Sequence, residues 1–336
     1  MSAHISTSTT PDDAIPSSGS LAHGAARSLA AALKSRVTVT DISRIPAGAS
    51  RQTWALTAEI NGQPRDLILR LDLPGSRADS SLTLEASLMN AAHRAGVASP
   101  EVIAVGARLD GHGGEYVIMS RVDGESIPRK LLRDDRFGVA RGRLAGQLGH
   151  ALARVHSIDI TQFPELSADD QLALWTTELD RIERPLPTFE YALSWLTAHR
   201  PASAGRCLVH GDFRLGNFLV DQEGLSAVLD WELAHLGDPL EDLGWMCVKA
   251  WRFGGDAPVG GFGSLDDFIG AYESHSEIAV DRDALFWWQV FGTLRWGVIC
   301  MNQTERHRGG AARSVELAAI GRRVSENEWE LLELLR

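Results

Sequence analysis

The stretch of sequence that decides the fold is LVHGDFRLGNFLVD at residues 208–221, with AVLDWE following at residues 227–232. Two short apolar runs here flank a turn at residues 222–224, which predicts a β-hairpin. Asn217 precedes the first run and Asp230 follows the second, so a hairpin brings them side by side at one end. We expect Asp212, five residues before Asn217, to face them from the preceding loop.

Three converging side-chain oxygens suit Mg²⁺, a hard cation that is held by few carboxylates together with phosphates. Phosphoryl transfer needs positioning, charge neutralisation and one carboxylate that orients the attacking hydroxyl. The alternative is that Asp212, Asn217 and Asp230 only cap turns. No second His or Cys stands at ligand spacing from His210, which argues against a transition-metal site.

His210-Gly-Asp212 with Asn217 resembles the catalytic loop of the aminoglycoside phosphotransferase and choline kinase superfamily, which is related to protein kinases. Residues 229–243 (LDWELAHLGDPLEDL) and 320–326 (IGRRVSE) are similar to one bacterial phosphotransferase branch. That branch includes the phosphotransferase domains associated with acyl-CoA dehydrogenases. The resemblance extends from Val37 to the C-terminus.

The resemblance implies that Asp212 is the catalytic base and that His210 supports the loop. It implies that Asn217 and Asp230 bind Mg²⁺, with ATP or GTP as the phosphoryl donor. Asp238 and Asp242 are expected to brace the segment after Asp230, although ordinary loop capping explains these two as well.

In the N-terminal half, residues 46–53 (PAGASRQT) look like the family's phosphate-covering loop, with Gly48 and Ser50 beside the phosphates. An ordinary hairpin is the alternative. The family often has a lysine on the next strand, but no lysine occurs here between Lys34 and Lys130.

Arg70 occupies the place of that lysine, and Glu85 on the following helix is its expected partner. A surface ion pair is the alternative. The resemblance also places the lobe hinge at residues 116–124, where Met119, Ser120 and Val122 would meet the adenine. Core packing explains Met119 equally well.

Residues 37–122 are mostly strand-like, with strands at 53–60, 66–71, 101–105 and 116–122. Asn61-Gly62 is a hairpin signal, and a helix is expected over 80–95 with a C-cap at Gly96. Further helices are expected at residues 141–156, 169–184, 189–199, 265–275, 283–301 and 314–335. We predict an α+β, bilobal protein-kinase-like fold with a disordered tail (1–20), a small antiparallel N-lobe (21–122) and a helical C-lobe (123–336).

Composition narrows the class of protein. The net charge is −11 and the basic residues do not cluster, so a nucleic-acid partner is not expected. No apolar run approaches the roughly 18 residues of a membrane span, and no signal peptide is apparent. Three isolated cysteines favour buried thiols over disulfides. We expect a cytoplasmic monomer or homodimer.

The predicted activity is ATP- and Mg²⁺-dependent transfer of the γ-phosphoryl group to a hydroxyl of a small molecule. The acceptor site is expected on the C-lobe, and the tryptophans there form either that site or the core. The alternative function is a nucleotide-binding pseudokinase with a regulatory or scaffolding role. A protein kinase is disfavoured because the chain lacks an A-P-E segment and a long activation loop.

Overall fold

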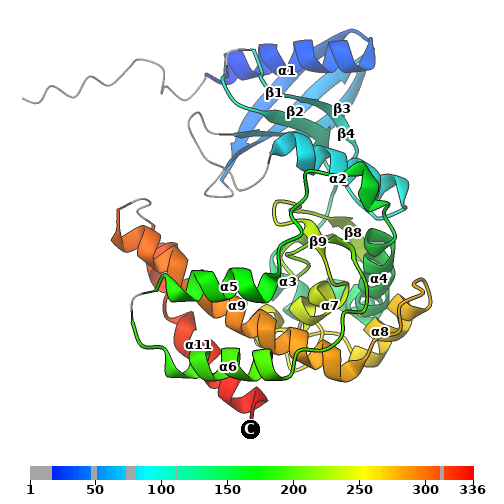
Figure 1. The fold of residues 1–336 in the computed structure, drawn as a ribbon. Helices are drawn as coiled ribbons and strands as arrows, with labels where there is room; N and C mark the ends of the chain where they lie inside the picture. Colours follow the sequence, from blue (N-terminus) through cyan, green and yellow to red (C-terminus); the bar gives the residue numbers. More distant parts are fainter. Residues whose placement is uncertain (1–16, 47–50, 73–80, 111, 183, 311–313) are drawn as a thin grey trace, which may run out of the picture. The chain divides into compact units, whose positions relative to one another are not determined.

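The computed structural model describes residues 17–46, 51–72, 81–110, 112–182, 184–310 and 314–336. The chain divides into two compact units, one of residues 1–90 and 100–121 and the other of residues 91–99 and 122–336. The first unit carries an antiparallel sheet and the second carries most of the helices (Figure 1). This composition confirms the predicted α+β fold class.

The sheet of the first unit has five antiparallel strands in the order β1-β2-β3-β5-β4. The predicted hairpin joins the second strand to the third, and Asn61 and Gly62 have the positive φ angles, 52° and 82°, that such a turn requires. The strands are β1 (Val37–Ile45), β2 (Arg51–Ile60), β3 (Gln63–Asp72), β4 (Val102–Gly106) and β5 (Tyr116–Ser120).

The core of this unit lies on one face of the sheet. Leu67, Leu69 and Leu71 alternate along β3 and are fully buried. Helix α1 (Ser18–Leu33) covers this face with the apolar side chains Leu21, Ala25 and Leu29. The sequence patterns predicted no element before Val37, so α1 was missed, and its first turn falls within the segment predicted as a tail.

Helix α2 (Leu82–Arg94) matches the helix predicted after the sheet hairpin. Gly96 follows it with a φ of 79°, and the N–H of Val97 donates to the Ala92 carbonyl at 2.9 Å. Gly96 therefore ends the helix as predicted, in a left-handed conformation that favours glycine.

The second unit is mainly helical, and α4 packs on α8, α7 on α9, and α9 on α11. Its α-helices are α3 (Pro128–Arg133), α4 (Gly138–His156), α5 (Gln171–Asp180), α6 (Pro187–Ala198), α7 (Leu240–Cys247), α8 (Leu265–Glu273), α9 (Arg282–Arg308), α10 (Val315–Ile320) and α11 (Arg323–Leu334). Short 3₁₀ turns occur at η1 (Asp135–Phe137), η2 (Ile160–Gln162) and η3 (Lys249–Arg252).

Three helical predictions need correction. Helix α7 was not predicted, because it is only eight residues long and its charged residues Glu241 and Asp242 are buried instead of forming an exposed polar side. Helix α9 continues past Met301 to Arg308, over exposed polar residues that carry no apolar signal. The helix predicted over residues 314–335 is interrupted at Gly321, a residue that weakens a helix interior.

Four short strands also lie in the second unit: β6 (Cys207–Val209), β7 (Phe218–Val220), β8 (Leu225–Val228) and β9 (His235–Gly237). Strands β7 and β8 form the predicted hairpin, and β6 pairs with β9. The three cysteines are free and buried, as predicted. Among the described residues, no helix has the length and apolar character needed to cross a bilayer.

Most tryptophans that were candidates for an acceptor site belong to the core. Five of them are at most 8% exposed: Trp231, Trp245, Trp251, Trp287 and Trp288. The sixth, Trp296, is partly exposed and lines a cavity. Core packing therefore accounts for five of these six residues.

Candidate active site

The β7–β8 hairpin brings Asn217 and Asp230 to one end, as the sequence predicts. Phe218 pairs with Val228, and the N–H of Leu229 donates to the Asn217 carbonyl at 2.8 Å. Asp230 follows with a φ of 67°, a left-handed conformation that is uncommon for residues other than glycine. Backbone strain of this kind is often found at functional sites.

The Asp212 carboxylate is held by three donors. Arg214 Nε and Trp245 Nε1 each donate to its Oδ1 atom at 2.9 Å. Asn217 Nδ2 donates to Oδ2 at 2.6 Å and to the Asp212 main-chain oxygen at 3.0 Å. Because the amide nitrogen of Asn217 makes both contacts, its amide oxygen is the atom that could bind a cation.

The environment of Asp212 keeps its side chain ionised. Burial by itself raises the pKa of this carboxyl, but the positive charge of Arg214 and the hydrogen bonds from Arg214 and Trp245 outweigh burial. Arg295 adds a further positive charge. The pKa of Asp212 therefore lies below its ordinary value, and the group is a carboxylate at neutral pH.

His210 supports the loop through hydrogen bonds to the main chain. Its Nε2 donates to the Leu229 carbonyl at 3.1 Å, so its Nδ1 accepts from the N–H of Asp212 at 3.3 Å. The ring is completely buried, and this burial lowers its pKa. A neutral His210 thus ties the Asp212 loop to the end of the β7–β8 hairpin.

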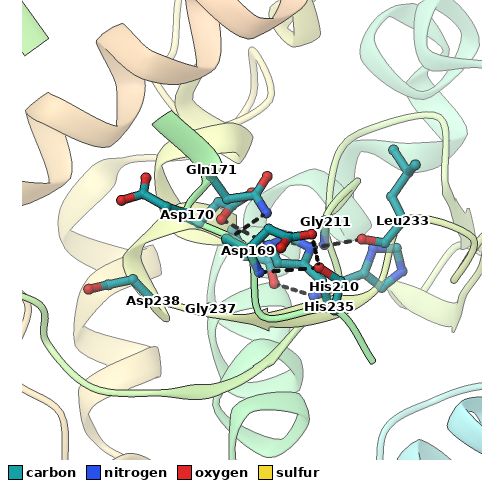
Figure 2. Close-up of polar contacts among 12 residues, drawn as sticks. Asp169, Asp170, Gln171, His210, Gly211, Leu233, His235, Gly237 and Asp238 are labelled. Carbon is teal, nitrogen blue, oxygen red and sulfur yellow. Dashed lines mark hydrogen bonds and ion pairs between the residues drawn. The ribbon is translucent and has the colours of Figure 1, made fainter. Parts of the chain in front are cut away.

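Gly211 cannot be replaced by a larger residue without a shift of the backbone. Its φ is 81°, and a Cβ atom here would lie 2.2 Å from the Leu233 carbonyl oxygen. Figure 2 shows His210 and Gly211 beside the segment that carries Leu233 and His235. This close approach explains why the loop has the pattern His-Gly-Asp.

Helix α7 holds the first residues of the loop. Asp242 is fully buried, and its carboxylate accepts from the N–H groups of His210 at 2.7 Å and Gly211 at 2.9 Å. His156 Nε2 contacts the same carboxylate at 3.2 Å. Asp242 thus braces the loop that leads into Asp212, rather than the segment after Asp230 that was predicted.

Asp238 differs from Asp242 in its surroundings. It is partly exposed, and its carboxylate accepts from the N–H of Leu240 and from Ser203 and Ala204. The contact with Leu240 is the local capping role that the sequence left open, and the contacts with Ser203 and Ala204 join Asp238 to a segment 34–35 residues earlier in the chain.

A second buried network lies behind the loop. Arg295 donates to the Gly211 carbonyl and to Glu241, both at 3.0 Å. His235 Nε2 lies 3.1 Å from Glu241, and its Nδ1 lies 2.9 Å from the Leu233 carbonyl (Figure 2). Both ring nitrogens face acceptors, an arrangement that favours the protonated form of His235. Burial lowers the pKa of His235, but Glu241 raises it more, and the pKa lies above its ordinary value.

The predicted ion pair of Arg70 and Glu85 is present in the first unit, with 3.2 Å between Arg70 NH1 and Glu85 Oε2. Glu85 is 1% exposed, which argues against a surface pair. Arg51 also binds Glu85, at Oε1, and its Nε contacts Asp72 at 2.9 Å. Glu85 therefore holds two arginines, of which the sequence indicated one.

The other predicted nucleotide-binding residues have simpler surroundings. Gly48 and Ser50 lie outside the described residues. Met119 is buried in β5 opposite Ile68, in keeping with core packing. Ser120 accepts from the N–H of Glu101 at 2.9 Å through its hydroxyl, and Val122 is partly exposed.

Three residues of the site were missed by sequence reasoning. Arg214 could have been noted from its place two residues after Asp212, inside the motif. Trp245 was named only as a general candidate for an acceptor site, because nothing in the sequence connects its indole N–H to Asp212. Arg51 directly precedes β-forming residues and gave no signal of burial.

An antiparallel-sheet unit, a helical unit and a buried His-Gly-Asp loop define the kinase-like class of phosphotransferases. A sequence model of the phosphotransferase enzyme family matches residues 41–278, which is more than two thirds of the chain. The chain therefore belongs to this family.

Comparison with individual proteins agrees with the family. Mouse acyl-CoA dehydrogenase family member 10 is 30% identical over 200 residues, which are 55% of this chain and 18% of the mouse protein. The chain thus matches less than a fifth of that relative's length. The match confirms the predicted resemblance to phosphotransferase domains of this kind.

Solved structures share the fold at low sequence identity. An aminoglycoside phosphotransferase-like protein from Ralstonia eutropha superposes with a TM-score of 0.66 at 22% identity, over 87% of this chain and 92% of that one. An amicoumacin kinase in complex with AMP-PNP and Ca²⁺ superposes with a TM-score of 0.59 at 16% identity, over 87% and 88%. At these identities the likeness establishes the fold alone.

Proposed function

We propose that this protein transfers the γ-phosphoryl group of ATP, or of GTP, to a hydroxyl of a small molecule in the presence of Mg²⁺. The observation that carries the proposal is the Asp212 carboxylate, which is ionised and fixed by Arg214, Trp245 and Asn217. A carboxylate held in this way can accept one more hydrogen bond, from the attacking hydroxyl.

Asn217 and Asp230 are the residues that would hold the metal. Both residues stand at the same end of the β7–β8 hairpin, and amide and carboxylate oxygens are ligands that suit Mg²⁺. Within the described ranges, no group of three or more His, Cys, Asp or Glu side chains is placed so that it could hold a metal ion. When bound, the cation would neutralise charge on the phosphates.

Asp212 acts on the acceptor in the proposed reaction. The hydroxyl oxygen forms a bond to the γ-phosphorus as the bond from that phosphorus to the β-phosphate oxygen breaks, and the nucleoside diphosphate leaves. The hydroxyl proton passes to Asp212. Since the pKa of Asp212 is low, we expect it to orient the hydroxyl first and to take the proton only as the new bond forms.

Arg70 is the proposed contact to the nucleotide phosphates, with Glu85 fixing its guanidinium. A guanidinium binds phosphate oxygens in pairs, so arginine can replace a lysine in this role. The family's structures support a nucleotide ligand, because the amicoumacin kinase was determined with AMP-PNP. We also propose a cytoplasmic location, in keeping with three free, buried thiols.

The test is acceptor-dependent turnover of MgATP. The purified chain is incubated with MgATP and a panel of amino alcohols, sugars, hydroxy acids and hydroxyacyl thioesters, and release of ADP is measured. We expect at least one acceptor class to raise ADP release well above the rate in water and to gain a phosphate by mass spectrometry. If MgATP binds but no acceptor class raises the release of ADP, the result would favour the pseudokinase alternative.

A further inference from the structure

A cavity of about 770 Å³ lies within the second unit. Its walls come from α3, the η3 turn, the middle of α9 and the start of α11, and α9 packs against α11. Ligand pockets of proteins measure roughly 300–1,000 Å³, so this cavity has the size for a metabolite.

Tilted aromatic rings in contact with one another connect the cavity with the candidate catalytic carboxylate. Trp296, on the cavity wall, lies 4.6 Å from Trp251 between ring centroids, and Trp251 lies 5.1 Å from Trp245. Trp245 donates to Asp212 at 2.9 Å. Arg214, the other donor to this carboxylate oxygen, lies 4.4 Å above the Trp251 ring. Three successive tryptophan rings therefore link the cavity wall to the Asp212 carboxylate.

The cavity is positively charged in a strongly acidic protein. Four basic and two acidic side chains line it: Arg129, Arg133, Lys249 and Arg323 against Glu326 and Glu330. Two of the cations are paired with the two carboxylates, because Lys249 contacts Glu330 at 2.7 Å and Arg323 contacts Glu326 at 3.3 Å. In the part of the chain that the structure describes, Arg129 and Arg133 have no acidic partner. A net charge of two positive units remains on the wall.

The uncharged part of the wall presents aromatic surface and a hydrogen-bond donor. Trp329 is 63% exposed, an unusually large apolar area to leave in water. The indole N–H of Trp296 is buried and finds no acceptor among the described residues. The unpaired guanidinium groups of Arg129 and Arg133 are donors, so a ligand that fits this wall supplies oxygen acceptors together with an apolar part.

We infer that this cavity binds the acceptor and that the acceptor is an anion: a hydroxylated compound with a carboxylate or phosphate group and an apolar portion. That the ligand is a phosphoryl acceptor rests on the proposed phosphotransfer. Binding of an anion in the cavity can be tested without it. Guanidinium groups bind carboxylate and phosphate oxygens in pairs, and Arg129 and Arg133 are positioned for either. A cationic acceptor would face unpaired positive charge here.

The binding test uses two dyes that differ by one sulfonate, 8-anilinonaphthalene-1-sulfonate and neutral N-phenyl-1-naphthylamine, without nucleotide. We expect the anionic dye to bind the full chain, with energy transfer from tryptophan. Its Kd should rise at least tenfold in the double variant Arg129→Ala/Arg133→Ala, while binding of the neutral dye changes less than twofold. Both residues are exposed, so the variant should fold. Competition with benzoate and with phenyl phosphate then separates carboxylate from phosphate recognition.

Arg282→Ala is the matched control, because it removes an exposed arginine of the same unit that does not line the cavity. Equal weakening in this control, or no weakening in the double variant, would overturn the inference. The inference would also be overturned if the protein phosphorylated cationic amino alcohols and did not phosphorylate their anionic analogues. In that case the proposed function would stand. If anions bind in a way that depends on Arg129 and Arg133 but no acceptor supports ATP turnover, the result would support the anion site in the cavity and contradict the proposed phosphotransfer.

Discussion

The orientation and the pKa of the Asp212 side chain depend on residues that lie both near to it and far from it in the sequence. Asn217 lies five residues away, so its contact follows from the local hairpin and could be predicted. Trp245 lies 33 residues away, and its N–H reaches the carboxylate only because α7 packs behind the loop. Spacing within a motif therefore predicted which residues meet, but the electrostatics of the site depend on tertiary packing.

The metal assignment can be tested at Asn217 and Asp230. We expect Asp230→Ala to weaken binding of MgATP more than Asn217→Ala, because only Asp230 brings a formal charge to the cation. Titration calorimetry with MgATP and with metal-free ATP measures the effect. Unchanged MgATP affinity in Asp230→Ala would remove this residue from the metal site.

Arg70 and Arg51 share Glu85 and should respond differently to substitution. Arg70→Ala should weaken MgATP binding about tenfold or more, corresponding to about 1.4 kcal/mol, with partial recovery in Arg70→Lys. Glu85→Ala should also lower the free energy of unfolding, because it leaves the buried Arg51 without its main partner.

Arg65→Ala is the control for Arg70, since Arg65 lies on the same strand in an exposed pair with Glu101. Its MgATP affinity should equal that of the unchanged protein. Normal affinity in Arg70→Ala would mean that Arg70 only pairs with Glu85.

At the scale of elements, α7 organises the site although it was not predicted from the sequence. The helix is only eight residues long, and its charged residues Glu241 and Asp242 are buried instead of marking a solvent-facing side. By contrast, the Asn61-Gly62 hairpin and the Gly96 cap were predictable because local backbone chemistry decides them.

Asp242 is the contact through which α7 holds the loop. Asp242→Asn replaces an acceptor oxygen with an N–H₂ group that faces main-chain donors, so we expect a loss of about 2 kcal/mol or more in the free energy of unfolding. Denaturant unfolding measures this loss. Asp238→Asn, which is partly exposed and near the same helix, should lose about 1 kcal/mol or less. Equal losses in the two variants would contradict the bracing role.

At the scale of the whole molecule, the free energy of unfolding should depend on the charge of His235. The pKa of His235 is raised in the folded protein by Glu241, although Arg295 opposes the shift. Its contribution to stability is therefore fully present below the unfolded value of about 6.5 and is lost as pH rises through the folded pKa.

Chemical denaturation between pH 6 and 9 measures this dependence. Because the buried His210 has a lowered pKa and contributes in the opposite direction in both proteins, the comparison with His235→Gln isolates His235: we expect the free energy of unfolding to fall more, or rise less, with pH in the unchanged protein than in this variant. Identical slopes in the two proteins would show that His235 is not the group responsible.

The change from period-two to period-3.6 patterns near residue 122 could be read from the sequence. Helix α1 was missed although its Ala-rich sequence favours a helix and Leu21, Ala25 and Leu29 recur at helical spacing. The cavity and its charge were inaccessible from the sequence, because Arg129, Lys249 and Arg323 come from distant segments.

The most direct test of the account is the activity of Asp212→Asn on the best acceptor from the panel. Asparagine keeps the shape of the side chain but removes the charge that orients the hydroxyl and accepts its proton. We expect kcat to fall by about a thousandfold or more, while the Kd for MgATP changes by less than about threefold. Turnover close to that of the unchanged protein would contradict the central role of Asp212.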